Sequence, residues 1–470
     1  MKDTKIEINH PELTRKFVEL INLTKQTYDQ ERVFNRVLAL AMSELFTLGR
    51  HTITQQLMSL GLVEEDWSAW YRLFSEKRFK GEEVSRIMAT QMITTLTEDT
   101  PFVVGVDGFH IPRSSTKMPG TGWMRGLRTA KFRPGIQRGQ RFCECSWLTP
   151  MENGYSRAIP ISCVDAFTVK SIEGEHEPRT EVEAGVEMVG MIREQMDKNG
   201  REEQKLMVLG DGSYDTLSFW PGLPHQTVGV VRTARNRCLY YLPTEDAHGN
   251  RKYGEKAPAP HEWLKKRKGF TRQTVVVRGR ERPMRYRVEG PFVRDTLADI
   301  PLFLIVVGGG KRPAGSRRKS YSPCFFLVSA EWLDGEWQLP LAITQLLAWL
   351  WQRWELEVAH RDMKSGLGLG EKQCWNPHST VATVQWSVWI FSLMLLSGYM
   401  LWKDSPKQPP GRWRKPAGRW SFNTLWRAFR SEIWSLTHFQ ATWLWSRDNW
   451  LENEPLEPNL FNSVLAATRT

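Results

Sequence analysis

The chain has 470 residues and a formal net charge of +12, which predicts two to four domains rather than one small core. The surplus of Lys and Arg favours a polyanionic partner, a nucleic acid ahead of an anionic membrane surface. Six scattered cysteines without a CxxC pair exclude a disulfide framework and argue against structural zinc. Together with an N-terminus that lacks a secretory signal, they predict a cytoplasmic protein.

The first 98 residues predict a helical domain, because apolar side chains recur at three-to-four spacing. Within it, the sequence predicts a short helix from Thr52, a turn at Gly61 and a second helix from about Asp66 to Ser75. This spacing is typical of a helix-turn-helix and would suit recognition of DNA ends. A plain helical bundle explains the same pattern equally well.

From residue 102 the pattern changes to β, with an apolar run that meets Asp107. The alternation around Cys143 and Cys145 also predicts a strand. Between Gly108 and Cys143 there is no acid, and we predict a surface that contacts the DNA backbone. The basic residues of this stretch are Arg113, Lys117, Arg125, Arg128, Lys131, Arg133, Arg138 and Arg141.

A helix is predicted near residues 181–199, followed by a second apolar strand that meets Asp211. Residues 225–340 are β-rich and basic, and the chain after Pro340 is helical apart from a Pro-rich basic loop. The fold class is therefore a multidomain combination of α and β structure. The predicted divisions are residues 1–98 (helical), 99–222 (first core part), 223–340 (inserted β-rich domain), 341–402 (second core part) and 403–470 (basic loop and helical end).

One apolar run, residues 384–402, is close to the length of a membrane span. A single such run in a highly charged chain is more often a buried helix, and we predict a core helix and no membrane partner.

Phosphodiester cleavage and strand transfer use two divalent cations held by carboxylates. Asp107 and Asp211 each follow an apolar strand, so neighbouring strands could present both at one edge of a sheet. Either acid alone is more often a turn residue. The third candidate is Glu357, which shares a predicted helix face with Arg353, His360, Arg361 and Lys364. By itself, that face could also be an ordinary solvent-exposed set of ion pairs.

The segment "LWQRWELEVAHRDMK" resembles the signature helix of the DDE transposases of bacterial insertion sequences, written Y-(2)-R-(3)-E-(6)-K. Arg353, Glu357 and Lys364 stand at the R, E and K positions with the spacing kept. Leu350 stands where the family has tyrosine, a residue linked to DNA hairpin formation, and Trp351 or Trp349 could replace it. Cleavage and joining are therefore better supported than a hairpin route.

Two other segments carry the resemblance. "VLGDGSYDT" is similar to the family's second-acid pattern, and "GVVRTARNR" to the strand that follows it. "VVGVDGFHI" is similar to the first strand of an RNase H-like core. The order Asp, Asp, Glu, with the β-rich segment before the Glu helix, implies an RNase H-like core with an inserted domain.

The resemblance implies a transposase that uses Asp107, Asp211 and Glu357 as catalytic residues and as ligands of two Mg²⁺, or Mn²⁺. Its partners would be double-stranded DNA, both terminal inverted repeats and target, bound by a homodimer at the bacterial nucleoid. The residues predicted to contact DNA are Arg353, Lys364, Arg361, His360, Arg232, Arg125, Arg128 and Lys131.

Several neighbouring residues receive other interpretations. Asp215 is expected in a turn or helix cap, and Glu355 on another helix face than Glu357. Related enzymes stack a flipped base on a tryptophan of the inserted domain, but Trp332 and Trp337 are each expected in the core. Two other functions stay open: a DNA-binding protein that has lost transposition, and a nuclease that hydrolyses without joining strands.

Overall fold

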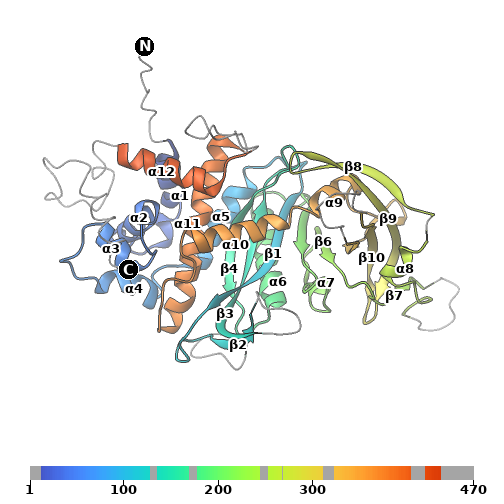
Figure 1. Ribbon diagram of the computed structural model, residues 1–470, viewed down its shortest axis with the longest axis horizontal. Helices are drawn as coiled ribbons and strands as arrows, with labels where there is room; N and C mark the ends of the chain where they lie inside the picture. Colours follow the sequence, from blue (N-terminus) through green and yellow to red (C-terminus); the bar gives the residue numbers. More distant parts are fainter. Residues whose placement is uncertain are drawn as a thin grey trace, which may run out of the picture.

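The computed structural model describes residues 12–126, 135–168, 177–243, 252–266, 268–310, 322–403 and 419–435. Helices gather at one end of the molecule, and a long mixed sheet runs from its centre to the other end (Figure 1). The fold is therefore mixed α and β, as predicted.

The N-terminal segment is helical, as predicted. Thr52 caps the third helix through its side-chain oxygen, which accepts a hydrogen bond from the Gln55 amide at 3.3 Å. The predicted pair of helices on either side of Gly61 is confirmed. The elements are α1 (Glu12–Asn22), a 3-10 turn (Lys25–Thr27), α2 (Glu31–Phe46), α3 (Ile53–Ser59), α4 (Ser68–Ser75) and α5 (Gly81–Ile93).

The centre of the sheet consists of three antiparallel strands continued by two parallel ones. β4 pairs with β3, β3 with β1, β1 with β5, and β5 with β6. The strands are β1 (Phe102–Pro112), β3 (Ile136–Leu148), β4 (Ala158–Asp165), β5 (Leu206–Gly210) and β6 (Thr227–Arg232), and a short β2 (Gly122–Arg125) pairs with β3. The continuous apolar runs of β1 and β5 fit strands that are covered on both faces.

Helices cover both faces of this centre. α6 (Glu181–Lys198) and α10 (Trp354–Ser365) both contact β1. A Cβ added at Gly105 would collide with Leu356 of α10, and one added at Gly108 would overlap the carboxyl group of Glu181 of α6. Because residues three apart on a strand face opposite sides, α10 and α6 lie on opposite faces of β1.

The β-rich segment extends the same sheet rather than forming a separate one. β6 pairs with β11, followed by β10, β9 and β7, so the predicted division at residues 222 and 223 falls inside one continuous sheet. Its elements are β7 (Leu239–Tyr241), β8 (Thr271–Val277), β9 (Arg280–Arg294), β10 (Leu297–Val307), β11 (Cys324–Ser329), the hairpin β12 (Glu331–Leu333) and β13 (Glu336–Gln338), and the short α7 (Phe219–Gly222) and α8 (Pro260–Trp263).

The apolar run near the C-terminus forms α11 (Pro377–Trp402), which contacts α1, α4, α5, β4 and α12 (Phe422–Ser435). By length and composition it could cross a membrane, but 94% of its most apolar window is buried inside the protein. The predicted core helix is confirmed. Its neighbours on several sides explain why it has no polar face.

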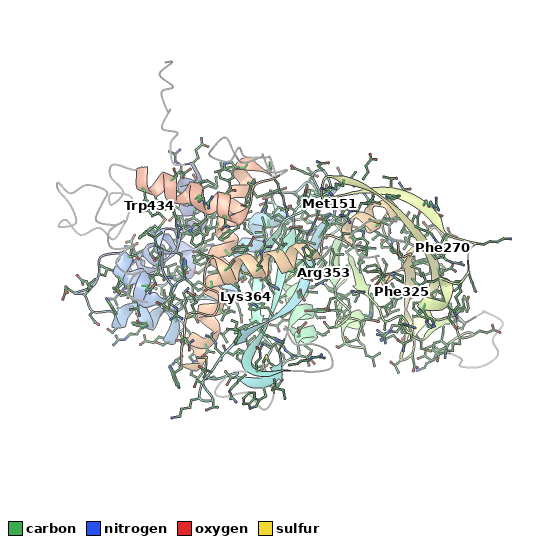
Figure 2. The ribbon with its side chains drawn as sticks, viewed as in Figure 1. Met151, Phe270, Phe325, Arg353, Lys364 and Trp434 are labelled. Atoms are coloured by element: carbon green, nitrogen blue, oxygen red, sulfur yellow. The ribbon has the colours of Figure 1, made fainter. Side chains whose placement is uncertain are left out.

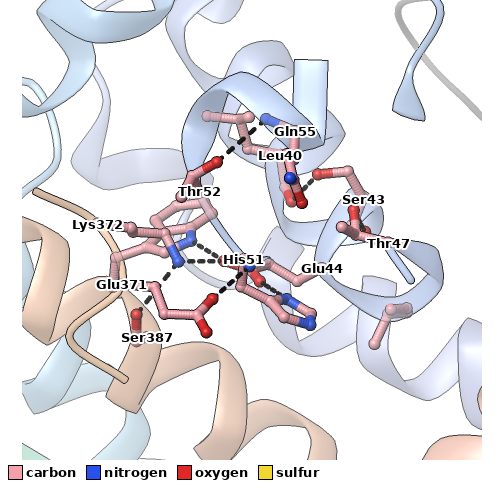
Figure 3. A network of polar contacts seen from close by, with 12 residues as sticks. Leu40, Ser43, Glu44, Thr47, His51, Thr52, Gln55, Glu371, Lys372 and Ser387 are labelled. Atoms are coloured by element: carbon pink, nitrogen blue, oxygen red, sulfur yellow. Dashed lines mark hydrogen bonds and ion pairs between the residues drawn. The ribbon is translucent and has the colours of Figure 1, made fainter. Parts of the chain in front are cut away.

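A buried network of polar side chains joins the N-terminal helices to the loop after α10 (Figure 3). Glu44 of α2 accepts hydrogen bonds from Lys372 Nζ at 2.9 Å, Trp386 Nε1 at 3.0 Å and His51 Nδ1 at 2.6 Å. Glu371 accepts one from the His51 amide at 2.8 Å. We call Glu44, His51, Lys372 and Trp386 the junction network. It ties the helical end to the chain that leaves the predicted Glu helix.

Candidate active site

The first two predicted acids occupy equivalent positions on neighbouring parallel strands. The last pair in register between β1 and β5 is Gly105 and Leu209, and Asp107 and Asp211 each stand two residues further on. β1 does not end at Asp107 as expected, because it continues to Pro112 against β3. Only its parallel pairing with β5 ends before Asp107, since β5 stops at Gly210. Both side chains therefore lie where β1 is no longer paired with β5.

The third acid reaches the same edge from α10. Arg353 directly precedes this helix, and its guanidinium donates to Asp107 Oδ2 at 3.1 Å and to Glu357 Oε1 at 2.9 Å. One side chain thus joins two acids that are 250 residues apart in the chain. Figure 2 shows Arg353 near the middle of the molecule, and Lys364 further along α10. We call Asp107, Asp211, Arg353 and Glu357 the acid edge.

Asp211 is held by the turn that follows β5. Its Oδ1 accepts hydrogen bonds from the Ser213 amide at 2.7 Å and from Ser213 Oγ at 2.5 Å. This local turn is typical of Asp at the end of a strand. It leaves Oδ2 of Asp211 without a hydrogen bond among the described residues, and therefore able to accept another partner.

The surroundings of Asp107 at the acid edge disfavour its charged form. Burial raises the pKa of Asp107, and Arg353 and His360 only partly offset the rise. Asp211 and Glu357 repel Asp107 and raise its pKa further. A divalent cation among these acids would relieve that repulsion.

Carboxylate oxygens are the ligands that Mg²⁺ prefers, so the donor set fits such an ion. Within the described residues, however, no group of three or more His, Cys, Asp or Glu side chains is arranged so that it could hold a metal ion. Arg353 instead bridges Asp107 and Glu357.

A cavity of about 290 Å³ adjoins these acids. Its walls include Asp211, Glu357 and Arg353 together with Arg232, the last residue of β6, and the half-exposed Trp354. Apolar side chains from β6, β11 and the segment before α10 complete it. The cavity thus combines acids, two guanidinium groups and an aromatic ring in one place.

His360 lies behind the acid edge rather than on its exposed face. It is buried beside Phe109, and its Nε2 stands 3.4 Å from Oε2 of the buried Glu144. Burial lowers the pKa of His360, but Glu144 and Asp107 outweigh it and raise the pKa above its ordinary value. His360 therefore lies between Asp107 and Glu144, which are partners in the register of β1 and β3, and its expected contact with phosphate stays a prediction.

The other predicted DNA contacts divide into three groups. Lys364, Arg361 and Arg232 are exposed, although Arg361 is paired with Asp362 at 2.8 Å. Arg125 is exposed on β2, away from the acid edge in sequence and fold, while Arg128 and Lys131 lie outside the described residues.

The basic stretch is only partly a surface. Arg113 is buried and donates to Gln140 and to the Gly370 carbonyl, and Arg138 donates to the carbonyl oxygens of Ser115 and Thr121. The expectation that Arg113 contacts DNA is wrong because its side chain is buried, whereas Arg138 is half-buried and its contact with DNA stays a prediction. They hold the loop after β1 in place.

Two acids next to the candidate residues are structural. Asp215 is neither a turn nor a cap residue: it is buried and accepts from Arg294 at 2.7 Å and Thr233 at 2.6 Å, with Arg237 paired to it as well. Glu355 faces away from Glu357, as predicted, and pairs with Arg278 and Arg419. Both are fully engaged by basic partners.

The aromatic residues near the acids lie at different depths. Leu350 and Trp349 are buried, and the half-buried Trp351 donates to Met284 Sδ at 3.2 Å. Leu350 and Trp351 also line the cavity beside Glu357, so the replacement of the family's tyrosine by a tryptophan stays a prediction. The exposed ring beside the acids is Trp354, which the sequence pattern did not single out.

The hairpin of β12 and β13 also departs from prediction. Trp332 packs edge-on against Trp337 across β12 and β13 and is 57% exposed. The core assignment of Trp332 is therefore wrong, because a two-stranded hairpin outside the main sheet has no second layer to cover it.

Neither a scan against models of protein families nor a search of curated proteins finds a match for this chain.

Proposed function

We propose that this protein is a metal-dependent DNA transposase, which cuts DNA at the ends of a mobile element and joins the freed ends to a target. The observation that carries the proposal is the acid edge. Asp107 and Asp211 occupy equivalent positions on parallel strands, and Arg353 connects Asp107 to Glu357 from the helix that covers them.

The order of the central strands supports an RNase H-like core. Three antiparallel strands, β4, β3 and β1, are followed by the parallel strands β5 and β6, with α6 between β4 and β5. This is the arrangement that the resemblance of the helix signature implies. In such a core the acids lie at the open edge of the two middle strands.

In this proposal Asp107, Asp211 and Glu357 hold two Mg²⁺. When bound, the cations activate the attacking oxygen and stabilise the leaving one. Arg353 fixes Glu357 relative to Asp107, and with Arg232 it presents positive charge to a phosphate in the adjoining cavity. Water attack breaks the P–O3′ bond and leaves a 3′-hydroxyl. That hydroxyl then attacks a target phosphodiester and releases a target 3′-oxygen.

Two basic side chains near the part of β1 that extends past Asp107 support a DNA backbone there. Arg141 Nε donates to His110 Nε2 at 3.2 Å. Burial lowers the pKa of His110 to about 4, and the charges of Arg141 and of Lys364, in the last turn of α10, add to this effect. A DNA backbone that continues past the acid edge would bring its phosphates near Arg141 and Lys364.

The test is cleavage and joining of DNA by purified protein in Mg²⁺ or Mn²⁺, with oligonucleotides from the regions flanking the coding sequence. Asp107→Ala, Asp211→Ala and Glu357→Ala should each slow cleavage by about a thousand-fold, or ~4 kcal/mol of transition-state stabilisation. DNA binding measured by fluorescence anisotropy should persist. Glu187→Ala, on the exposed face of α6, is the matched control and should cleave as the wild type does.

The outcome decides between the open functions. Cleavage by all three variants would show that the assignment of the acids is wrong. Cleavage without joined products would indicate a hydrolytic nuclease, and binding without cleavage by the wild type would indicate a DNA-binding protein.

A further inference from the structure

The first residue of α6, Glu181, lies beside the acid edge and takes no part in the capping box of its helix. The helix is capped by its neighbours: Thr180 Oγ1 accepts from the Glu183 amide at 3.2 Å, and Glu183 accepts from the Thr180 amide at 2.7 Å. Among the described residues, the Glu181 carboxylate accepts only a long hydrogen bond of 3.4 Å, from Ser213, and forms no ion pair. Helix capping therefore does not explain it.

Gly108 provides the space that the Glu181 carboxyl group fills. A Cβ at this position would overlap the carboxyl carbon and both oxygens. Residue 108 faces α6, whereas Asp107 faces α10, so a side chain at 108 would occupy the place of the Glu181 carboxyl group. The missing side chain allows an acid of α6 to reach the edge where Asp107 and Asp211 lie.

Ser213 links Glu181 to the second acid. Its hydroxyl lies 2.5 Å from Asp211 Oδ1 and 3.4 Å from Glu181 Oε1. Because the hydroxyl has one proton, it can donate to only one of the two carboxylates at a time. Ser213 holds both groups close while it neutralises neither.

We propose that Glu181 is a fourth catalytic carboxylate, which joins Asp107 and Asp211 in holding one of the divalent cations. This role rests on the proposed function. It adds an acid from the face of the sheet that α6 covers. Glu357 then approaches from the α10 face and Glu181 from the α6 face.

The charges around Glu181 agree with this role. Burial raises its pKa, Arg141 acts against the rise, and Asp107 and Asp211 add to it. One base, Arg141, therefore acts on Glu181 against two further acids, an arrangement that costs stability unless a cation joins them. Asp215, in contrast, is paired with both Arg294 and Arg237.

The direct test is Mn²⁺ binding by the full chain without DNA, measured by electron paramagnetic resonance. Glu181→Gln, which keeps the shape and removes the charge, should weaken binding at one site by at least about tenfold. Its melting temperature in EDTA should equal or exceed that of the wild type, because a repulsive charge is removed. Glu187→Gln, two turns along the exposed face of α6, should change neither value.

A double-mutant cycle tests the role of Gly108. Gly108→Ala should weaken Mn²⁺ binding about as much as Glu181→Gln does, because the new methyl group displaces the carboxylate. In a Glu181→Ala background the same substitution should have little further effect, since the clash is gone. Independent, additive losses would show that Gly108 does not act through Glu181.

The outcomes separate this proposal from the function on which it rests. Unchanged Mn²⁺ binding in Glu181→Gln, with binding lost in Asp107→Ala, would overturn the role of Glu181 and leave the transposase proposal standing. A lower melting temperature in EDTA with unchanged Mn²⁺ binding would mark Glu181 as structural. Mn²⁺ binding that survives in Asp107→Ala as well would overturn both proposals.

Discussion

The junction network and the acid edge both combine acids with bases, yet they balance charge in opposite ways. At the junction network, the single carboxylate of Glu44 meets Lys372, His51 and the Trp386 indole. At the acid edge, the single guanidinium of Arg353 is shared between Asp107 and Glu357, and Asp211 adds a third negative charge. The junction network has more hydrogen-bond donors than acids, whereas the acid edge has more acids than bases.

The pKa values follow this difference. Burial alone would raise the pKa of Glu44, but Lys372 and His51 outweigh it and lower the pKa to about 2. Burial raises the pKa of Asp107, and here the basic neighbours do not reverse the effect. An acid that is fully compensated stabilises the fold. Acids left under-compensated at an open edge indicate a place where a cation from outside completes the balance.

The largest expected effect is at the junction network. Glu44→Gln leaves the ammonium of Lys372 buried without a counter-charge, which should lower the free energy of unfolding by about 3 to 5 kcal/mol. Urea denaturation followed by circular dichroism measures it. Glu31 lies on α2 as Glu44 does, and it forms an exposed ion pair with Lys25 of the preceding 3-10 turn. Glu31→Gln breaks this pair and should lower the free energy of unfolding by less than about 1 kcal/mol. Equal losses in the two variants would remove the contrast between buried and exposed pairs.

A smaller effect is expected from pH. The pKa of Glu44 is about 2 in the folded chain, against an ordinary value of 4.5. Because the folded value is depressed, the stabilisation is complete above pH 4.5 and is lost as the pH falls toward 2. This pH-dependent stabilisation by Glu44 amounts to ~3 kcal/mol. The difference in unfolding free energy between wild type and Glu44→Gln should therefore shrink between pH 5 and pH 3. A difference that stays constant would show that Glu44 does not titrate in this window.

The sequence predicted the elements of this fold where local patterns are strong. The apolar runs that meet Asp107 and Asp211 are β1 and β5, and the run at residues 384–402 is the buried helix α11. The spacing of Arg353 and Glu357 also predicted that they share a helix face, and the two side chains form an ion pair there. These are short-range relations, which a single sequence carries directly.

The sequence did not predict relations that depend on which face of the sheet a helix covers. His360 shares a helical pattern with Glu357, but a buried acid on β3, Glu144, draws it inward. Arg113 belongs to a one-signed stretch and yet is buried, because carbonyl oxygens of the loop after α10 accept its hydrogen bonds. The sequence does not single out Glu181 for the same reason: its place beside Gly108 depends on the tertiary packing of α6 against β1. The one sequence signal was a glycine directly after the first acid.

The smallest expected effect has the opposite sign and tests the acid edge itself. Burial and two neighbouring acids disfavour the charged form of Asp107, and Arg353 and His360 only partly offset them. Asp107→Asn removes that charge and leaves Arg353 paired with Glu357, so in EDTA the melting temperature should rise by about 2 °C, or less than ~1 kcal/mol for a chain of this size. Asp215→Asn is the matched comparison, since Asp215 is a buried acid four residues after Asp211 with Arg294 and Arg237 paired to it. It should lower the melting temperature, because the buried guanidinium of Arg294 and the half-buried one of Arg237 lose their counter-charge. Differential scanning calorimetry of both variants decides the point. If Asp107→Asn also melts lower in EDTA, Asp107 contributes to stability as Asp215 does, and the acid edge has no excess of negative charge for a cation to relieve.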